Sequence, residues 1–234
     1  MSYSKKILFS VRVVVILLVI GAASGCLSSM DRGLNEQSIQ GEIEPVIPPP
    51  WRLYGPVDGT PAYDFIGGLD IQIKRSGARS ACFLAIDVSN DDQARWMQRF
   101  KADEWRGKRV RFSAYLKSHQ LSEWAGLWMR VDTDTRQSYA FDDSEDRSLT
   151  GTTDWTLFEV VLDVPENAAV IFLGAHMFGR GQVWMDDCAF EEVGDDVPAT
   201  DKYRLRGGYQ RQFTISGFLN DEPLNLDFEE NEIM

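Results

Sequence analysis

The sequence predicts an all-β protein built as an antiparallel β-sandwich. Short apolar or alternating runs follow one another from Trp51 onward, and each has the length of a strand. Gly, Asp, Asn and Pro divide these runs, and these are the residues that favour turns. No segment keeps an apolar period of 3.6 residues over three turns, so helices are not expected between the strands.

The expected strands follow one another at the spacing of an antiparallel sandwich or jelly roll. Within 108–118, apolar and charged residues alternate, which predicts one buried and one wet face. Within 181–193, both faces are largely apolar, which predicts a strand covered on both sides. The expected strands are 70–75, 80–87, 95–102, 108–118, 124–133, 138–143, 155–164, 169–178 and 181–193.

Length and composition bound the function classes. The 234 residues are 44% hydrophobic and 12% aromatic, which suffices for one substantial core. The formal net charge is -12, and binding to phosphate backbones needs clustered Lys and Arg instead. We expect one main domain and no nucleic-acid partner.

The first residues predict export. Two lysines precede an apolar run, strongest over 13–23, that has the length of a signal-peptide core. Small residues lead from there to Cys26, and this stretch resembles the lipobox of bacterial lipoproteins, with Ala23 where leucine is usual. The resemblance implies that residues 1–25 are a signal peptide, and that lipidated Cys26 anchors the chain to a membrane outside the cytoplasm. A plain signal peptide or a retained anchor helix is the alternative.

The residue after the cysteine bears on the destination. It is Leu27 and not Asp, which resembles the pattern of lipoproteins sent to the outer membrane in bacteria with two membranes.

Two further segments flank the expected sandwich, which we place at 51–193. Residues 26–50 have no apolar period and end in "PVIPPP", which predicts a flexible linker with a stiff end. Residues 194–234 predict a second linker and a tail with one strand, "RQFTISGF". The tail string "NLDFE" predicts either the first strand of a following domain or a strand that pairs back on the sandwich.

Four strings carry a resemblance to a known kind of module: "GKRVRFSAYLKS", "WAGLWMRVD", "AFDDSEDRSLTGTTDWTLFEVVLDVP" and "GQVWMDDCAFEEV". From about Gly107 to Val193 the chain resembles a galactose-binding-like, carbohydrate-binding-module-like jelly roll. The resemblance implies a non-catalytic binding module whose ligand is a carbohydrate or cell-envelope glycan. A structural or protein-interaction role in the envelope, or an accessory domain of a hydrolase, is the alternative.

One strand face offers a platform for a ligand. Alternation within 124–133 puts two tryptophans and an arginine on the same side, where a sugar ring could stack. Packing of Trp128 against neighbouring strands, and a structural role for His176, are the alternatives. The candidate ligand-binding residues are Trp124, Trp128, Arg130 and Tyr115, with Arg111 and His176 behind them.

Asp186 is the candidate metal ligand. Alternation places it on one strand face with Trp184, Cys188 and Phe190, where an isolated charge would be costly. The resemblance implies a structural calcium near the sandwich edge, since related jelly rolls often bind one through an acid on the last strand. Hydrogen bonds from backbone N–H groups, or an ion pair with an arginine, are the alternatives.

The remaining reactive residues predict no catalytic site. Neighbouring acids on a strand point to opposite faces, so no acidic pair forms a glycosidase dyad. No GxSxG motif is present, and two histidines are all that could serve a nucleophile. We expect the chain not to be an enzyme.

Two cysteines lie within the expected sandwich. Cys82 and Cys188 could form a disulfide if their strands are neighbours with facing Cβ atoms. Two buried free thiols are the alternative.

Overall fold

The structure is a computed structural model that describes residues 39–55, 62, 64–85, 93–135, 137–201 and 219–230. The predicted signal peptide, Cys26, the first part of the linker and the string "RQFTISGF" lie outside the described residues. Within the described ranges, no helix is long and apolar enough to cross a membrane.

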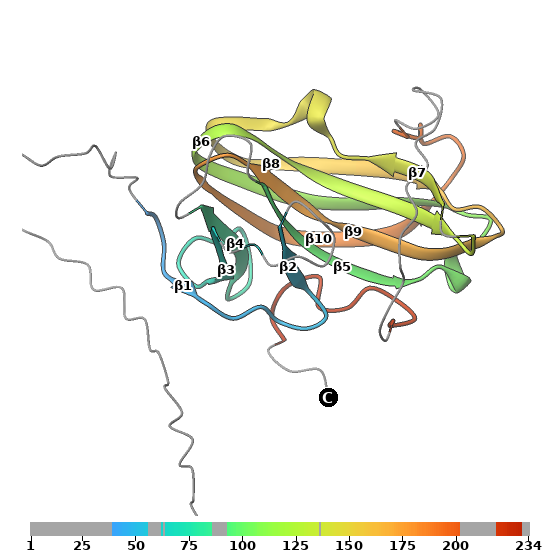
Figure 1. Cartoon of the computed structure of the whole chain (residues 1–234), viewed down its shortest axis with the longest axis horizontal. Helices are drawn as coiled ribbons and strands as arrows, with labels where there is room; N and C mark the ends of the chain where they lie inside the picture. Colours follow the sequence, from blue (N-terminus) through green and yellow to red (C-terminus); the bar gives the residue numbers. More distant parts are fainter. Residues whose placement is uncertain are drawn as a thin grey trace, which may run out of the picture. The chain divides into compact units, whose positions relative to one another are not determined.

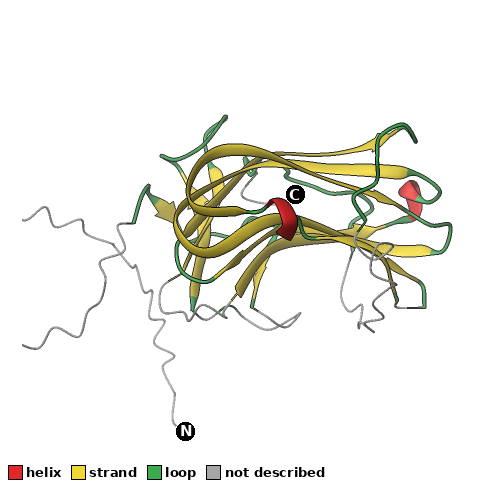
Figure 2. Ribbon diagram, turned by 90° about the horizontal axis from the view of Figure 1, so that it is seen from above, coloured by secondary structure: helices red, strands yellow, loops and turns green. Residues whose placement is uncertain are grey.

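The described strands form an antiparallel sheet that curls into two layers (Figures 1 and 2). The sheet order is β1-β3-β4-β10-β6-β9-β5-β2, and β7 and β8 also pair with β6. This confirms the predicted all-β, antiparallel class. The strands are β1 (Ile43–Glu44), β2 (Arg52–Tyr54), β3 (Phe65–Asp70), β4 (Ser80–Ala85), β5 (Gln93–Lys101), β6 (Arg109–Thr133), β7 (Ser138–Asp142), β8 (Leu149–Asp163), β9 (Ala168–Phe178) and β10 (Gln182–Val193), and two short 3-10 turns are η1 (Asp103–Trp105) and η2 (Glu145–Arg147).

Strand β6 belongs to both layers. Its first half pairs with β10 and β8, and its second half pairs with β9 and β7. Gln120 has a φ of 49° at the bend, and the pairing with β8 changes register there. Two separate strands were expected over this stretch, so the sequence pattern missed their continuity.

The bend in β6 also changes which residues face the core. Before it, the even-numbered residues from Val110 to Leu116 point inward, and after it the odd-numbered residues from Ala125 to Val131 do so. The predicted faces of both halves are confirmed, because each half alternates regularly by itself.

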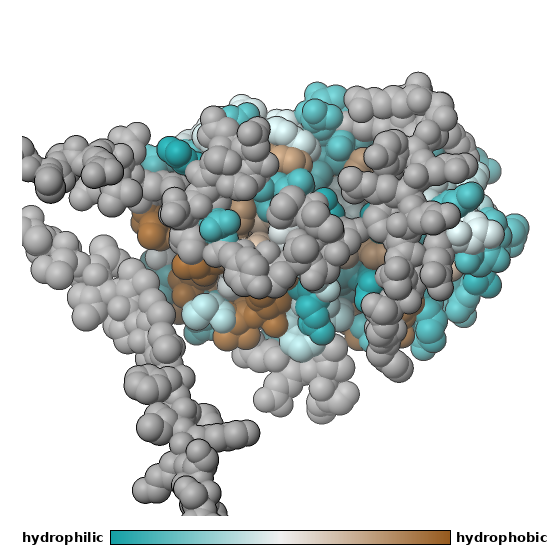
Figure 3. All heavy atoms as spheres, in the orientation of Figure 1, coloured by the Kyte–Doolittle hydropathy of each residue, from teal (hydrophilic) through white to brown (hydrophobic). Residues whose placement is uncertain are grey.

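The core lies between the two layers. It is rich in large side chains that are fully buried, and burying one such side chain is worth about 1.5–3 kcal/mol. Figure 3 shows hydrophobic residues gathered over the side of β2 to β4 and hydrophilic residues over the opposite end. The largest fully buried side chains include Trp51, Phe83, Trp96, Phe100, Phe112, Leu127 and Phe228.

The first expected strand is displaced. A strand was predicted at 70–75, but β3 ends at Asp70 and residues 71–79 form a loop. The Asp70 carboxylate accepts hydrogen bonds from the backbone N–H groups of Gln72 (2.8 Å) and Ile73 (2.9 Å), which turns the chain away from the sheet. The pair Gly67-Gly68 hid the true strand, because glycines usually mark turns.

Part of the expected linker belongs to the sheet. β1 pairs with Leu69 and Asp70 of β3, and Gln40 exchanges hydrogen bonds with Gln182 of β10. Gly68 permits this contact, since a Cβ there would lie 2.2 Å from the carbonyl oxygen of Glu44.

The tail string "NLDFE" packs back on the sandwich without forming a strand. The Trp51 indole N–H donates to the carbonyl oxygen of Asn225 at 2.8 Å. Phe228 is fully buried, with its ring 5.1 Å from that of Trp51 and 6.5 Å from that of Trp96. Phe228 is therefore part of the core of the sandwich, and Leu226 packs against that core.

We expect Phe228→Ala to lower the free energy of unfolding by about 3–5 kcal/mol, because it leaves a cavity between two tryptophans. Urea unfolding followed by tryptophan fluorescence measures this. Leu157→Ala is the matched control, since Leu157 is 49% exposed and its truncation should cost little. A similar small loss in both variants would contradict the packing of the tail.

Candidate functional site

The outer surface of one layer carries most of the predicted ligand-binding residues. This layer consists of β2, β5, β9, the second half of β6 and β7, and we call its outer surface the aromatic face. Alternation with the inward residues of each strand defines its members. Its aromatic and charged members are Arg52, Tyr54, Arg95, Arg99, Lys101, Trp124, Trp128, Arg130, Asp132, Tyr139, Phe141, Phe172, His176 and Phe178.

One end of the aromatic face is a cluster of stacked rings. Trp124 stacks on Phe178, with ring centres 4.3 Å apart and an angle of 19° between the planes. The His176 ring stands edge-on to Trp124 at 4.8 Å and lies 6.4 Å from Trp128. Trp124 and Phe178 are half-buried, whereas Trp128 and His176 are buried. The predicted grouping of Trp124, Trp128 and His176 is thus present in the structure.

Arg130 lies on the same face in a buried ion pair. Its guanidinium carbon is 4.2 Å from the centre of the Phe172 ring, a cation–π contact. Its Nε is 3.0 Å from Oδ1 of Asp132, and both side chains are almost fully buried. Asp132 also accepts a hydrogen bond from the Ser138 hydroxyl at 2.9 Å.

Two glycines allow the rings to lie close to the sheet. Gly174 is the neighbour of Trp128 across the strand pair, so no Cβ lies beside the indole at that position. A Cβ at Gly126 would lie 2.7 Å from the carbonyl oxygen of Asp143 and 3.4 Å from the Trp124 ring. Both glycines therefore let neighbouring groups approach the strand backbone closely.

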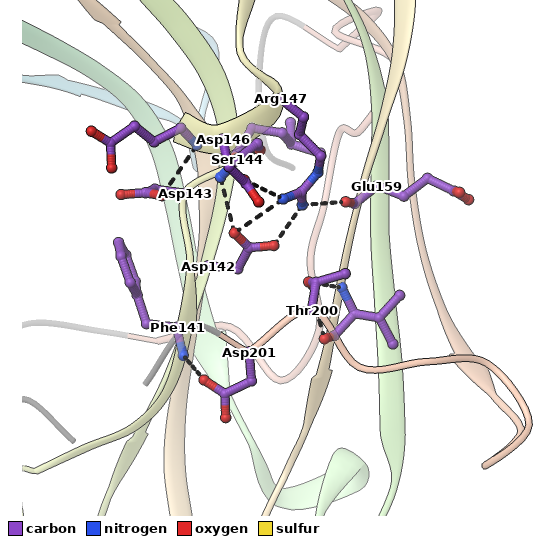
Figure 4. A network of polar contacts seen from close by, with 12 residues as sticks. Phe141, Asp142, Asp143, Ser144, Asp146, Arg147, Glu159, Thr200 and Asp201 are labelled. Carbon is purple, nitrogen blue, oxygen red and sulfur yellow. Dashed lines mark hydrogen bonds and ion pairs between the residues drawn. The ribbon is translucent and has the colours of Figure 1, made fainter. Parts of the chain in front are cut away.

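A loop after β7 closes this end of the face (Figure 4). The buried carboxylate of Asp142 accepts hydrogen bonds from the Ser144 backbone N–H at 3.0 Å and from Arg147 at 2.5 Å. Ser144, with a φ of 53°, turns the chain so that the Asp143 carbonyl oxygen meets His176. Because a carbonyl oxygen only accepts, Nε2 of His176 donates this bond, 3.2 Å long, and carries a proton.

The segment after β10 holds the edges of both layers. Thr200 hydrogen-bonds to Val161 of β8 through its backbone N–H and its hydroxyl, and Asp201 accepts from the backbone N–H of Phe141 in β7 at 3.2 Å. The first part of the expected second linker, as far as Asp201, is therefore attached to the sandwich (Figure 4).

Tyr115 and Arg111 do not lie on the aromatic face. They belong to the first half of β6, in the other layer, because β6 crosses between layers at Gln120. The Arg75 guanidinium stacks 3.5 Å from the Tyr115 ring centre, and Arg111 pairs with two glutamates of β8 and β10. The six predicted binding residues therefore cannot form one site.

Other members of the aromatic face went unnoticed in the sequence. Alternation within the string "RWMQRF" already places Arg95, Met97 and Arg99 on one side, opposite the core residues Trp96 and Phe100. The signal was present, but only the sheet order shows that β5 lies beside β9.

Asp186 lies on the outer surface of the other layer and accepts hydrogen bonds from the backbone. Its Oδ2 accepts from the N–H groups of Arg75 (2.6 Å) and Ser76 (3.1 Å), and its Oδ1 accepts from that of Asp187 (2.7 Å). The loop 71–79 thus folds over the carboxylate. Of the alternatives expected for Asp186, the structure shows hydrogen bonds from backbone N–H groups. In these contacts no arginine side chain pairs with the carboxylate.

These contacts do not fit a calcium site. Three backbone N–H groups already take up most of the roughly four lone pairs of the Asp186 carboxylate. Among the described residues, no group of three His, Cys, Asp or Glu side chains could hold a metal ion.

The strand faces of β10 differ from the prediction beyond Asp186. Asp187 has a φ of 50°, and the pairing with β6 shifts there, which is a β-bulge. The extra residue turns Cys188 and Phe190 toward the core, whereas Trp184 and Asp186 face outward. Alternation alone had placed all four residues on one face.

The two thiols are free. Cys82 faces outward from β4, between the inward residues Ala81 and Phe83, while Cys188 packs against the core. Opposite faces of the layer keep the sulfur atoms apart, and burial raises the pKa of both thiols.

Comparison with known proteins adds one informative relative. No protein-family model matches the sequence. An uncharacterized HTH-type transcriptional regulator of Bacillus subtilis (strain 168), YbfP, is 40% identical over 175 residues, which are 74% of this chain and 56% of the relative. The chain thus spans little more than half the length of the curated relative that it matches.

Solved structures resemble the chain only distantly. The Clostridium thermocellum xylanase 10B modules complexed with xylohexaose are 14% identical over 62% of this chain and 26% of that one, with a TM-score of 0.43. TmCBM61 in complex with β-1,4-galactotriose is 13% identical over 62% of this chain and 90% of that one, with a TM-score of 0.40. Similarity at this level says nothing of what this chain binds.

The relative contradicts the predicted function. A lipid-anchored envelope module for glycan, with an envelope structural role or a hydrolase accessory role as alternatives, was expected. A 74% match has to include the middle of the sandwich, β5 through β8, wherever it begins. The sandwich itself is therefore what this chain shares with a protein named as a transcriptional regulator. Sequence patterns alone could not reveal the link to a regulator, because the same β-sandwich fold occurs in proteins of many functions.

The environment of Asp186 predicts a pH dependence of stability. Burial raises its pKa, the negative charge of Asp187 adds to this, and the three backbone N–H groups offset it in part. Stability from a raised pKa is present below the ordinary Asp pKa of about 4 and is lost as pH rises through the folded-state value. We expect wild type to lose stability relative to Asp186→Asn as the pH rises from about 4 to 7.

Urea unfolding of both proteins at a series of pH values measures this. Asp154→Asn is a control of opposite sign, because a hydrogen bond from Lys117 lowers the pKa of Asp154. Wild type should gain stability relative to that variant as the pH rises. A gain relative to Asp186→Asn as well would mean that the backbone hydrogen bonds outweigh burial.

Proposed function

We propose that the sandwich is a sensory module of transcriptional regulation, which binds a ligand and does not itself contact DNA. The 40% identity to the regulator across the middle of the sandwich is the observation that carries the proposal.

The shared strands are not suited to reading DNA as a helix-turn-helix does. That motif needs two helices, the second of which enters the major groove. The described residues hold strands and two short 3-10 turns, and none of these turns is long enough to fill a groove. The net charge of -12 also opposes contact with phosphates. We therefore assign DNA contact to a part outside the shared stretch, or to a partner protein.

The aromatic face is our candidate for the sensing surface. Rings on rigid strands offer a ligand contact area at little entropic cost, and polar neighbours give it orientation. Trp124 and Phe178 are half-buried at the end of this face, where the loop 142–147 is held by Asp142 and Arg147. A ligand there would touch both the strands and this loop. A change in the loop on binding would then carry the signal to the rest of the regulatory system. In this proposal the module is a jelly roll without catalytic activity.

We expect loss of the gene to change a defined set of transcripts in the host, and Trp124→Ala in the chromosomal copy to change the same set. RNA sequencing measures both. Trp155→Ala is the matched control, because Trp155 is also half-buried but lies on β8, in the other layer. Unchanged transcription after gene deletion would refute the proposal. A sequence-specific gel shift with the full purified chain alone would refute the assignment of DNA contact elsewhere.

A further inference from the structure

Strand β8 forms an edge of the sheet, because in the described part of the chain its one strand partner is β6. Successive residues of an antiparallel strand direct their N–H and C=O groups to alternate sides. Val161 shows which residues point away from β6, since its N–H and its carbonyl oxygen bond to Thr200 instead. Glu159, Leu157 and Trp155 follow at the same spacing, so their backbone groups also point away from the sheet.

Part of this edge is closed by the chain itself. The backbone groups of Val161 are covered, and its side chain is buried. The carbonyl oxygen of Glu159 accepts from Arg147 at 2.9 Å (Figure 4), and the N–H of Trp155 donates to Oδ1 of Asp154 at 2.9 Å. Four outward groups have no partner among the described residues. They are the N–H and C=O of Leu157, the N–H of Glu159 and the C=O of Trp155.

The side chains at this open stretch favour contact with another strand. Leu157 faces away from the core and is 49% exposed. Two acids lie beside it, and both are already paired: Glu159 with Arg111 at 3.1 Å, and Asp154 with Lys117 at 2.8 Å. An exposed strand edge with an apolar side chain and no unpaired charge is a template for strand pairing.

The open backbone groups are complementary to themselves. An antiparallel pairing of two β8 strands, centred on Leu157, sets Leu157 opposite Leu157 of a second copy and Glu159 opposite Trp155. The two Leu157 residues then exchange both of their hydrogen bonds, and the open N–H of Glu159 meets the open C=O of Trp155. The remaining bond of this ladder would join the N–H of Trp155 to the C=O of Glu159. These two groups are the ones that already have partners within each chain.

We propose that two copies of this chain pair through β8, antiparallel and centred on Leu157, so that one layer of each sandwich joins a continuous sheet. A second copy carries the matching order of open and closed groups by symmetry, whereas an unrelated strand would have to reproduce it. No like charges lie directly opposite in this register, because Leu157 faces itself and Glu159 faces Trp155. The inference goes beyond the proposed sensory function and does not depend on it.

Sedimentation velocity of the full chain tests the pairing over about 5 to 200 µM. We expect the share of dimer to rise with concentration, since the contact is short and belongs with weak interfaces. Amide hydrogen exchange locates it in the unmodified chain. The N–H groups of Leu157 and Glu159 should exchange more slowly as the dimer forms, while the exchange of β9 should not change. A chain that stays monomeric over this range overturns the inference, also where the edge pairs with a strand of another protein.

Charge variants test the register. Leu157→Lys and Leu157→Glu each set like charges directly opposite across the two-fold axis and should weaken dimerisation about tenfold or more. An equimolar mixture of the two variants sets opposite charges there and should restore association, which a folding defect would not do. Ile66→Lys is the matched control, because Ile66 is also exposed, at 36%, but lies on β3. It should dimerise as wild type does.

Undiminished dimerisation of both charge variants would place the contact on another surface and overturn the inference. Failure of the mixture to associate would overturn the pairing centred on Leu157. The transcript experiment fails or succeeds separately, since its control Trp155→Ala keeps the carbonyl oxygen that the pairing uses.

Discussion

Strand β6 pairs with β10 and β8 in one layer and with β9 and β7 in the other, so both layers share one continuous backbone. The bend at Gln120 is therefore fixed by hydrogen bonds on both of its sides, and neither layer can shift its register alone. This constraint places Trp124, Trp128 and Arg130 on one outer surface and Tyr115 on the opposite one. Tyr115 and Trp124, nine positions apart on one strand, consequently lie on different surfaces.

The acidic composition of the chain has a structural use within the loop 71–79. Asp70, Asp186 and Glu229 each accept hydrogen bonds from two or more backbone N–H groups of this loop. The backbone N–H groups of a loop have no strand partner, so they need other hydrogen-bond acceptors. Carboxylates are strong acceptors. Carboxylates from β3, β10 and the tail thus fold the loop onto the sandwich, as a metal ion does in other loops.

The function proposed here depends on sequence identity more than on architecture. A β-sandwich supports many activities, and its distant structural likenesses do not select among them. An identity of 40% over 175 residues is a stronger link, and the proposed role in transcriptional regulation rests on it. The aromatic face then provides a surface on which a signal could act, since buried rings, an ion pair and a loop closed by Asp142 meet there. DNA contact and ligand contact are accordingly assigned to different parts.

The sequence by itself determined the all-β class, most of the strands after Ser80 and the inward residues of both halves of β6, because side-chain alternation is a local property of extended chain. Alternation also grouped Trp124, Trp128 and Arg130. Only the tertiary structure decided where alternation breaks, at Gln120 and at Asp187, since each left-handed residue is held by partners distant in the chain. It likewise decided that Arg99, Phe172, Arg130 and Phe141 form one row, because the order of strands in a sheet is set by long-range packing and not by any local pattern.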